Sequence, residues 1–380
     1  MVPEDVREKT SRIFAGYTLD DAYHYAEHSL LSSITALYED IPKTLLKEHY
    51  RCHPKIIGFC NNKFYNNELV VLTDEKEKKD PLVLYKTVKG NHARGTVNQR
   101  QIDVVLKEII PEQKLFNGTE SLGIITPFRR QADKFNEEKN KERFEVDTVH
   151  KYQGREKDTV ILSTVSNEIS TDDFVDDANL VNVAVSRAVN QLIVVVASGG
   201  DKWKGTNVGD LVRYIKYNNF EVIESKVRSV FDLLYKDYSS TLKEVMKRRK
   251  RVSAHASENL LHAVIESVLK QPEFQSLDFV MHQPLRMLIK DPTVLTPEER
   301  KFAMNIFTHT DFVIFNKLDK MPVLVVEVDG HAFHANNPVQ QERDKMKDRI
   351  LKKYGITIER METTGSEEEL KLRNKLLKLV

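Results

Sequence analysis

Short continuous runs of apolar residues alternate with amphipathic stretches over the first half of the chain. The runs are rich in β-branched residues, which is typical of buried strands, and they occupy residues 81–86, 122–126, 159–165 and 191–197. Helix-forming patterns separate them at residues 102–109, 128–140 and 179–189, the last beginning at Asn179, a capping-type residue. Strands that alternate with helices predict a doubly wound parallel sheet of the α/β class.

A second α/β pattern follows in the last third of the chain. An apolar helix face begins near Ser257, and apolar strands are predicted at residues 278–289, 310–315 and 323–328. A charged helix over residues 339–354 ends at Gly355, which is suited to a left-handed C-cap. A short strand over residues 356–360 and a final helix complete a smaller α/β domain.

A change in composition at Ser225 separates the two patterns, because a helical stretch rich in Tyr and Lys leads there to "KRRKR" at residues 247–251. A chain of 380 residues fits two or three domains, each large enough for its own core. We predict a leader over residues 1–43, a first α/β domain over 44–225, a helical basic linker over 226–256 and a second domain over 257–380.

Charge and cysteine content narrow the class of protein. The 58 Lys and Arg residues nearly balance the 57 Asp and Glu residues, so any site for a polyanion must be a local patch. Two cysteines, Cys52 and Cys60, and no signal-like N-terminus indicate a reducing, cytoplasmic compartment rather than a disulfide framework. No apolar run approaches the length that spans a membrane, so we expect no membrane partner.

Motifs of the first domain indicate a nucleotide-binding site. In "EHYRCHP", residues 48–54, the ring of Tyr50 is suited to stacking on a base and the planar donor Arg51 to phosphate oxygens. Arg187 in "VNVAVSRA" precedes a buried strand, a position suited to an arginine finger as well as to a solvated helical arginine. The dipeptide Gly-Lys never occurs, so the chain carries no phosphate loop of its own.

The ordered series "YRCHP", "GIITPFRRQ", "VDTVHKYQGREKD" and "VNVAVSRA" resembles the second RecA-like domain of superfamily 1 helicases over about residues 29–197. The leader resembles the segment after that family's third motif. The resemblance implies an ATP site shared with an N-terminal half, in cis or in trans, that carries the Walker motifs. It implies ATP contacts from Tyr50, Arg51, Gln153, Gly154, Glu156 and Arg187. It also implies that Thr148 and His150 contact a nucleic-acid strand, with DNA expected over RNA.

Acidic residues follow the apolar runs of the second domain. Asp311 begins one predicted strand, while Glu327 and Asp329 end the next and share one strand face. Carboxylates brought together in this way favour a cation, and oxygen ligands without cysteine favour Mg²⁺ or Mn²⁺ over zinc. We therefore assign a metal to Asp311 and Glu327, with a solvated hairpin end as the alternative. We assign His334 a hydrogen bond at the edge of this site rather than a zinc pair with His331.

The acidic series, the charged helix and "YGI" resemble the PD-(D/E)XK nuclease fold over residues 257–376, close to the very-short-patch repair endonucleases. The resemblance implies that Glu258, Asp311 and Glu327 form the acidic site of a metal-dependent nuclease. Asp329 stands where the family has a lysine, so Asp329 would orient water or a second ion. A lysine from the following helix would supply the missing charge; we assign Lys345, with Lys347 as the alternative.

The basic run predicts phosphate binding with counterion release, unless it is only a solvated linker. It comprises Lys247, Arg248, Arg249, Lys250 and Arg251. Taken together, the motifs predict the C-terminal part of a helicase-nuclease. Two alternatives remain open at this point: a catalytically inactive module that binds nucleic acid, and a docking module that completes the ATPase of a partner.

Overall fold

The chain forms two compact units, Met1–Glu48 and His49–Val380. The computed structural model describes residues 4–44, 46–75, 80–90, 92–115, 120–139, 144–152, 154–219, 222–248, 251–330 and 338–380. The first unit contains α1 Glu4–Phe14, η1 Asp21–Tyr23 and α2 Leu30–Leu37. A capping box between Ser29 and Ser32 starts α2, because each side chain accepts a backbone N–H of the other residue.

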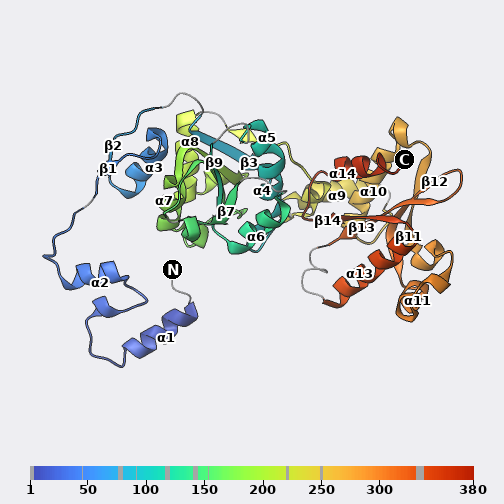
Figure 1. The fold of residues 1–380 in the computed structure, drawn as a ribbon, viewed down its shortest axis with the longest axis horizontal. Coiled ribbons are helices and arrows are strands. Elements are labelled where there is room, and N and C mark those ends of the chain that lie inside the picture. The colour runs from blue at the N-terminus through green and yellow to red at the C-terminus, as the bar shows by residue number, and fades with distance from the viewer. Residues whose placement is uncertain are drawn as a thin grey trace. The chain divides into compact units, whose positions relative to one another are not determined.

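A six-stranded sheet organises the first part of the second unit, in the order β10-β3-β9-β8-β6-β7 (Figure 1). All its strand pairs are parallel, which confirms the predicted doubly wound sheet. Its strands are β3 Leu82–Thr87, β6 Leu122–Thr126, β7 Glu145–Thr148, β8 Lys157–Ser163, β9 Ala188–Ala197 and β10 Ile223–Glu224. The sequence pattern missed β7 and β10, since both are short and carry acidic residues.

Helices cover both faces of this sheet. They are α3 Pro54–Phe64, α4 Gln99–Val104, α5 Ile110–Glu112, α6 Arg129–Glu138, α7 Ala178–Ser186 and α8 Asn207–Asn219, with a π-helical turn, η2 Val105–Ile109, joining α4 to α5. Leu84, Leu162 and Val194 face the cluster of α3, α7 and α8, whereas their neighbours Val83 and Ile161 face that of α4 to α6. One local expectation was wrong. The N-cap of α7 is Asp177, which accepts the Leu180 N–H, and not Asn179.

Shorter elements connect the layers. They are β1 Glu48–His49, β2 Val70–Val71, β4 Ala93–Arg94, β5 Val97–Asn98, η3 Val149–Tyr152, η4 Phe174–Asp176 and η5 Gly200–Lys202. The connection to the second domain is helical, with η6 Val230–Leu234, η7 Lys236–Tyr238 and α9 Ser239–Arg248. Arg100 of α4 is fully buried and forms a two-pronged ion pair with Asp232 of η6, at 2.9 and 3.1 Å. This ion pair therefore holds η6, the start of the helical connection, against the first domain.

The last part of the chain forms a four-stranded mixed sheet in the order β11-β12-β13-β14. The strands are β11 Leu277–Pro284, β12 His309–Asn316, β13 Pro322–Asp329 and β14 Thr357–Glu362; the last two are parallel and the other pairs antiparallel. The prediction that the first strand runs to Ile289 was wrong. Pro284 ends β11, and the chain turns into η9 Leu285–Leu288.

Helices cover both faces of this sheet (Figure 1). On one face lie α10 Ala256–Leu269 and α14 Glu368–Leu376, and on the other α11 Pro297–Met304 and α13 Pro338–Lys353, with η8 Pro272–Phe274 and η10 Pro292–Val294 in the connections. Gly355 follows α13 with φ +69°, as expected for a left-handed C-cap. Within the described ranges no helix is both long and apolar enough to cross a bilayer.

Candidate functional site

Three segments of the first domain meet where β8 and β9 begin. The Lys157 N–H donates to the Arg187 carbonyl at 3.1 Å, and the His53 N–H donates to the Val189 carbonyl at 2.7 Å. The Arg51 guanidinium lies 3.4 Å from the Glu156 carboxylate. The structure therefore brings together Arg51, Glu156 and Arg187, which come from three separate sequence motifs.

The two arginines carry more positive charge than their surroundings balance. Burial, together with the positive charge of Arg51, lowers the pKa of Arg187. The Nε atoms of Arg51 and Arg187 are both buried without a hydrogen-bond partner in the described part of the chain. Guanidinium groups left in this condition favour a multiply charged oxyanion, because its oxygens accept several of their N–H groups at once.

The backbone beside this arginine pair is open. Gly154 has φ +83°, and a Cβ added there would meet nothing within 4 Å. A residue with a side chain adopts this φ only at a cost, so the position favours glycine. Tyr50, next to Arg51, is 66% exposed as a residue. Gln153 lies outside the described residues, and its assigned contact stays a prediction.

Thr148 and His150 lie toward the other edge of the sheet. Thr148 ends β7 in register with Thr126 and so lies at the carboxyl edge, whereas Glu156 immediately precedes β8 and lies at the amino edge. The exposed His150 ring stacks on Phe174 with a centroid distance of 6.1 Å and an interplanar angle of 2°. Phe128 packs against Phe174 at 5.9 Å. The sequence motifs did not identify Phe174, because no local pattern links it to His150.

The acidic pair of the second domain lies on neighbouring strands. The Asp311 N–H donates to Glu327 Oε1 at 3.3 Å, and the Val328 N–H donates to Asp311 Oδ2 at 2.8 Å. Lys347 of α13 donates to Glu327 Oε2 at 2.6 Å and to the His309 carbonyl at 3.0 Å. Two carboxylates and one ammonium group thus meet on the sheet face that α13 covers.

Burial dominates the electrostatics of this pair. Loss of water around the carboxyl group, with a smaller contribution from the charge of Asp311, raises the pKa of Glu327 to about 7. The positive charge of Lys347 opposes this rise without cancelling it. A carboxylic acid residue that is only 5% exposed and has a pKa raised toward neutral is typical of sites that bind a cation or transfer a proton.

Two assigned residues do not join the pair. Lys345 is exposed, and Lys347 takes the position next to Glu327, because side chains two residues apart point about 200° apart around a helix. The Glu258 carboxylate contacts Ser253 and His282, and the structure records no contact between it and Asp311 or Glu327.

Asp329 is engaged by an arginine that the sequence analysis did not consider. Arg360 of β14 donates to Asp329 at 2.9 Å and to Asp348 at 2.7 Å. Burial alone would lower the pKa of Arg360, but the hydrogen bond to Asp348 and the charge of Asp329 raise it overall. The alternation of β13 places Asp329 and Glu327 on one face, each beside its own cation.

The donor set fits a magnesium-type ion better than zinc. Among the described residues, no three or more His, Cys, Asp or Glu side chains form a group that could hold a metal. Mg²⁺ is commonly held by one or two carboxylates, with water and substrate phosphate completing the shell, and Asp311 with Glu327 meets that requirement. His331 and His334 lie outside the described residues.

The structure describes only part of the basic run at residues 247–251. Lys247 and Arg248 are exposed in the last turn of α9. The Arg251 guanidinium donates to the carbonyls of Ser253 and Ala254, so some of its donors are engaged by the backbone. Arg249 and Lys250 lie outside the described residues.

Comparison with known proteins finds similarity to helicases in the first domain. Residues 26–199 match a family described as an AAA domain. A DNA polymerase alpha-associated DNA helicase A of Saccharomyces cerevisiae is 29% identical over 208 residues, covering 45% of this chain and 30% of the relative. These matches support a superfamily 1 helicase domain. A regulator of nonsense transcripts 1 homolog of Neurospora crassa is 31% identical over 178 residues, covering 40% of this chain and 16% of the relative.

The matched region accounts for less than half of the chain, and the alignments cover less than a third of these two relatives. Residues 250–379 match a family described as "Protein of unknown function (DUF2726)", which assigns no activity to the second domain. A crystal structure of the C-terminal domain of a possible DNA helicase from Lactobacillus plantarum aligns with 46% of this chain and 98% of that chain, at 15% identity and a TM-score of 0.30. The parallel sheet itself fits the RecA-like fold of the helicase domain.

Proposed function

We propose that this chain provides the second half of the ATP site of a nucleic-acid helicase and that its C-terminal domain is a divalent-metal-dependent nuclease that acts on DNA rather than RNA. The proximity of Arg51 and Arg187, whose Nε atoms are buried without a hydrogen-bond partner among the described residues, carries the first proposal. The second proposal rests on Asp311, Glu327 and Lys347.

In the proposed motor, Arg187 contacts the γ-phosphate as an arginine finger and Arg51 holds neighbouring phosphate oxygens. Glu156 keeps Arg51 in place until ATP binds, since the two side chains are 3.4 Å apart. The open backbone at Gly154 admits the sugar-phosphate side of the nucleotide, with Gln153 beside it, and Tyr50 stacks on adenine. An N-terminal helicase half, in cis or in trans, supplies the phosphate-loop lysine and the Mg²⁺-binding residues.

We propose that nucleic acid passes the opposite edge of the sheet, where Thr148 and His150 contact the strand. The stack of His150 on Phe174 holds the imidazole in one orientation and leaves it exposed. The exposed Lys247 and Arg248, with the rest of the basic run, add phosphate contacts whose strength falls with salt.

In the proposed nuclease, Asp311 and Glu327 hold Mg²⁺ or Mn²⁺ against the scissile phosphate. When bound there, the ion would supply polarisation of the phosphoryl oxygen and would lower the pKa of an attacking water molecule. Lys347 then stabilises the negative charge that develops on the phosphate, the role of the strand lysine in the PD-(D/E)XK pattern. Asp329, held by Arg360, orients the water. Hydrolysis forms one P–O bond to water and breaks the P–O bond to the leaving sugar oxygen.

The test is cleavage without ATP. The purified chain is incubated with linear DNA, circular DNA and RNA in Mg²⁺ or Mn²⁺, beside Asp311→Asn and Glu327→Gln, which keep the side-chain shape and remove the charge. Glu298→Gln, an exposed position on α11, is the matched control. Cleavage that both site variants lose and the control retains supports the proposal.

One observation favours a second candidate, a catalytically inactive module that binds nucleic acid or docks onto a partner ATPase. Lys347 and Arg360 already balance the charges of Glu327 and Asp329 without any metal. If the parent chain cuts no substrate, or the site variants cut as well as the parent, this candidate replaces the nuclease. Either function suits a reducing, cytoplasmic compartment, where the buried free thiols of Cys52 and Cys60 persist.

A further inference from the structure

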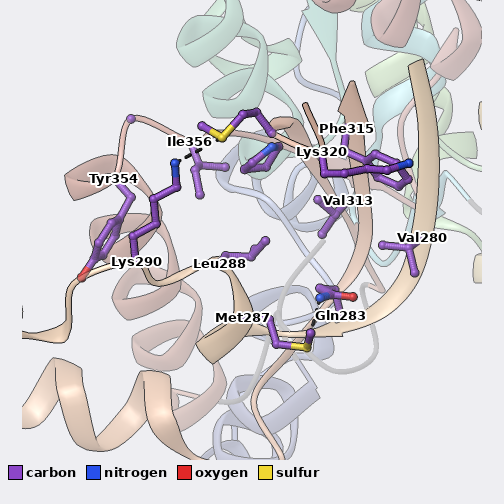
Figure 2. A pocket seen from close by; sticks show the side chains of 13 residues that line it. Val280, Gln283, Met287, Leu288, Lys290, Val313, Phe315, Lys320, Tyr354 and Ile356 are labelled. Carbon is purple, nitrogen blue, oxygen red and sulfur yellow. Dashed lines mark hydrogen bonds between the residues drawn. The ribbon is translucent and has the colours of Figure 1, made fainter. Parts of the chain in front are cut away.

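A cavity of about 510 Å³ lies beside the edge strand of the C-terminal sheet (Figure 2). Val280 of β11 and Val313 of β12 are cross-strand neighbours in its lining, and Phe315 and Ile356 extend the apolar part. Its volume falls in the range of small-ligand sites, which are mostly apolar with a few polar groups. The helicase domain and the acidic pair make no use of this cavity.

Two lysines of the cavity, Lys290 and Lys320, form no ion pair with any residue that the structure describes. Lys290 Nζ lies 3.2 Å from the sulfur of Met321, and Lys320 Nζ lies 5.2 Å from the centroid of the Phe315 ring. Over the described part of the chain, no carboxylate lies within ion-pair distance of either ammonium group. Two unbalanced cations at an apolar cavity favour a ligand with an apolar body and an anionic group.

The nearest acidic side chains in sequence are engaged elsewhere. The Asp291 carboxylate accepts the N–H and the hydroxyl of Thr293, and the Asp319 carboxylate accepts the Met321 N–H. Asp291 and Asp319 thus cap local turns rather than neutralise Lys290 and Lys320. The charge at the cavity remains positive.

The remaining lining groups suit a flat heterocycle. Figure 2 shows Lys290 on the same side as Tyr354, with Lys320 against Phe315 on the other side. Phe315 and Tyr354 provide aromatic surface for stacking, and the amide of Gln283 can both donate to and accept from a base edge. An aliphatic chain would use the apolar walls but neither the amide nor the aromatic surface.

The cavity shares a sheet face with the acidic pair. Asp311, Val313 and Phe315 alternate onto one face of β12, and four residues of strand span about 13 Å. Stacked nucleotides advance about 3.4 Å per step, so this span corresponds to roughly four steps of a strand. A strand whose phosphate lies at Glu327 therefore reaches the cavity within a few nucleotides.

We propose that this cavity binds one unstacked nucleobase, with its phosphate between Lys290 and Lys320. The inference rests on the proposed action of the C-terminal domain on nucleic acid, and it adds a base-binding site a few nucleotides from the acidic pair. A free nucleotide and a nucleotide within a strand both have a base and a phosphate. The experiment therefore tests each of these two ligands separately.

Binding is measured in EDTA with the full chain, so that cleavage plays no part. The probes are free 5-iodo-dUMP and a five-nucleotide single strand with one central 5-iodouracil; each is photocrosslinked and the attachment is mapped by mass spectrometry. Val280→Trp fills the cavity from a position that is 38% exposed, so the fold tolerates the larger ring. Lys290→Gln with Lys320→Gln removes the phosphate contacts, and the exposed pair Lys301→Gln with Lys352→Gln is the control for lost charge.

We expect crosslinks at Phe315 or Tyr354 from at least one probe. Both cavity variants should reduce them at least tenfold, since loss of one stacked base or two phosphate contacts has about that effect, and the control pair should leave them unchanged. Crosslinks that avoid the cavity, or that persist in Val280→Trp and the double lysine variant, overturn the inference. If the chain crosslinks at the cavity but never cuts DNA, the nuclease proposal is wrong and the base-binding site stands. If the chain cuts DNA without such crosslinks, only the base-binding site is wrong.

Discussion

Lys347 Nζ lies 2.6 Å from Oε2 of Glu327, and both residues are less than a tenth exposed. The lysine comes from α13 and the carboxylate from β13, so the contact depends on how the helix packs on the sheet. It places a fixed positive charge at the acidic pair, where the strand offers Asp329 instead of a lysine.

Lys347→Gln should reduce metal-dependent cleavage of DNA by about 10²–10³-fold, the loss typical when one group that stabilises transition-state charge is removed. Lys345→Gln should cleave like the parent, because Lys345 points to solvent. Initial rates on one DNA substrate compare the variants, with circular dichroism showing that each is folded. Equal losses in both variants would contradict the role given to Lys347.

The raised pKa of Glu327 predicts that the free energy of unfolding depends on pH. Its pKa is raised from 4.5 to about 7 in the folded chain, so the stabilisation is fully present below pH 4.5 and is lost as the pH rises through about 7. The loss is on the order of 3 kcal/mol, at 1.36 kcal/mol per pKa unit. Urea unfolding at several pH values should show this decline in the parent and not in Glu327→Gln. A decline of the same size in the variant would assign it to other groups.

The chain alone should not hydrolyse ATP, because it contains no phosphate loop. Mixed with a matching N-terminal helicase half, it should give hydrolysis that nucleic acid stimulates, and Arg187→Ala should reduce kcat by about 10³–10⁵-fold. Arg213→Ala is the control, since Arg213 pairs with Asp210 on α8. Strong ATPase activity of the chain alone that survives Arg187→Ala would refute the assignment.

Breaking the Arg100–Asp232 pair should strongly destabilise the fold. Arg100 is 0% exposed and has no other carboxylate at hydrogen-bond distance in the described structure, so Asp232→Asn leaves a buried charge uncompensated. We expect a loss of about 3–5 kcal/mol in the free energy of unfolding. Glu266→Gln breaks an exposed pair with Lys270 and should cost less than about 1 kcal/mol. Denaturant unfolding compares the two; similar losses would show that Arg100 is compensated elsewhere.

Sequence alone predicted the main strands and their parallel arrangement. Runs such as 122–126 and 191–197 are mostly apolar and are buried at every position because both sheet faces are covered, and this signal is local. The pairing of Asp311 with Glu327 was also predictable, since each lies at a strand end of one hairpin. Glu258 was assigned to that pair from its place in a family pattern, and the structure gives it other partners.

Only the tertiary structure decided which side chains meet across elements. Arg51 and Arg187 lie far apart in the chain, and their proximity depends on how residues 51–53 dock onto the start of β9. Helical periodicity places Lys345 and Lys347 on different faces of α13, but the rotation of α13 on the sheet selects Lys347. Sequence patterns indicate which face of each element is buried. The packing angle between elements depends on many long-range contacts, and no local pattern contains them.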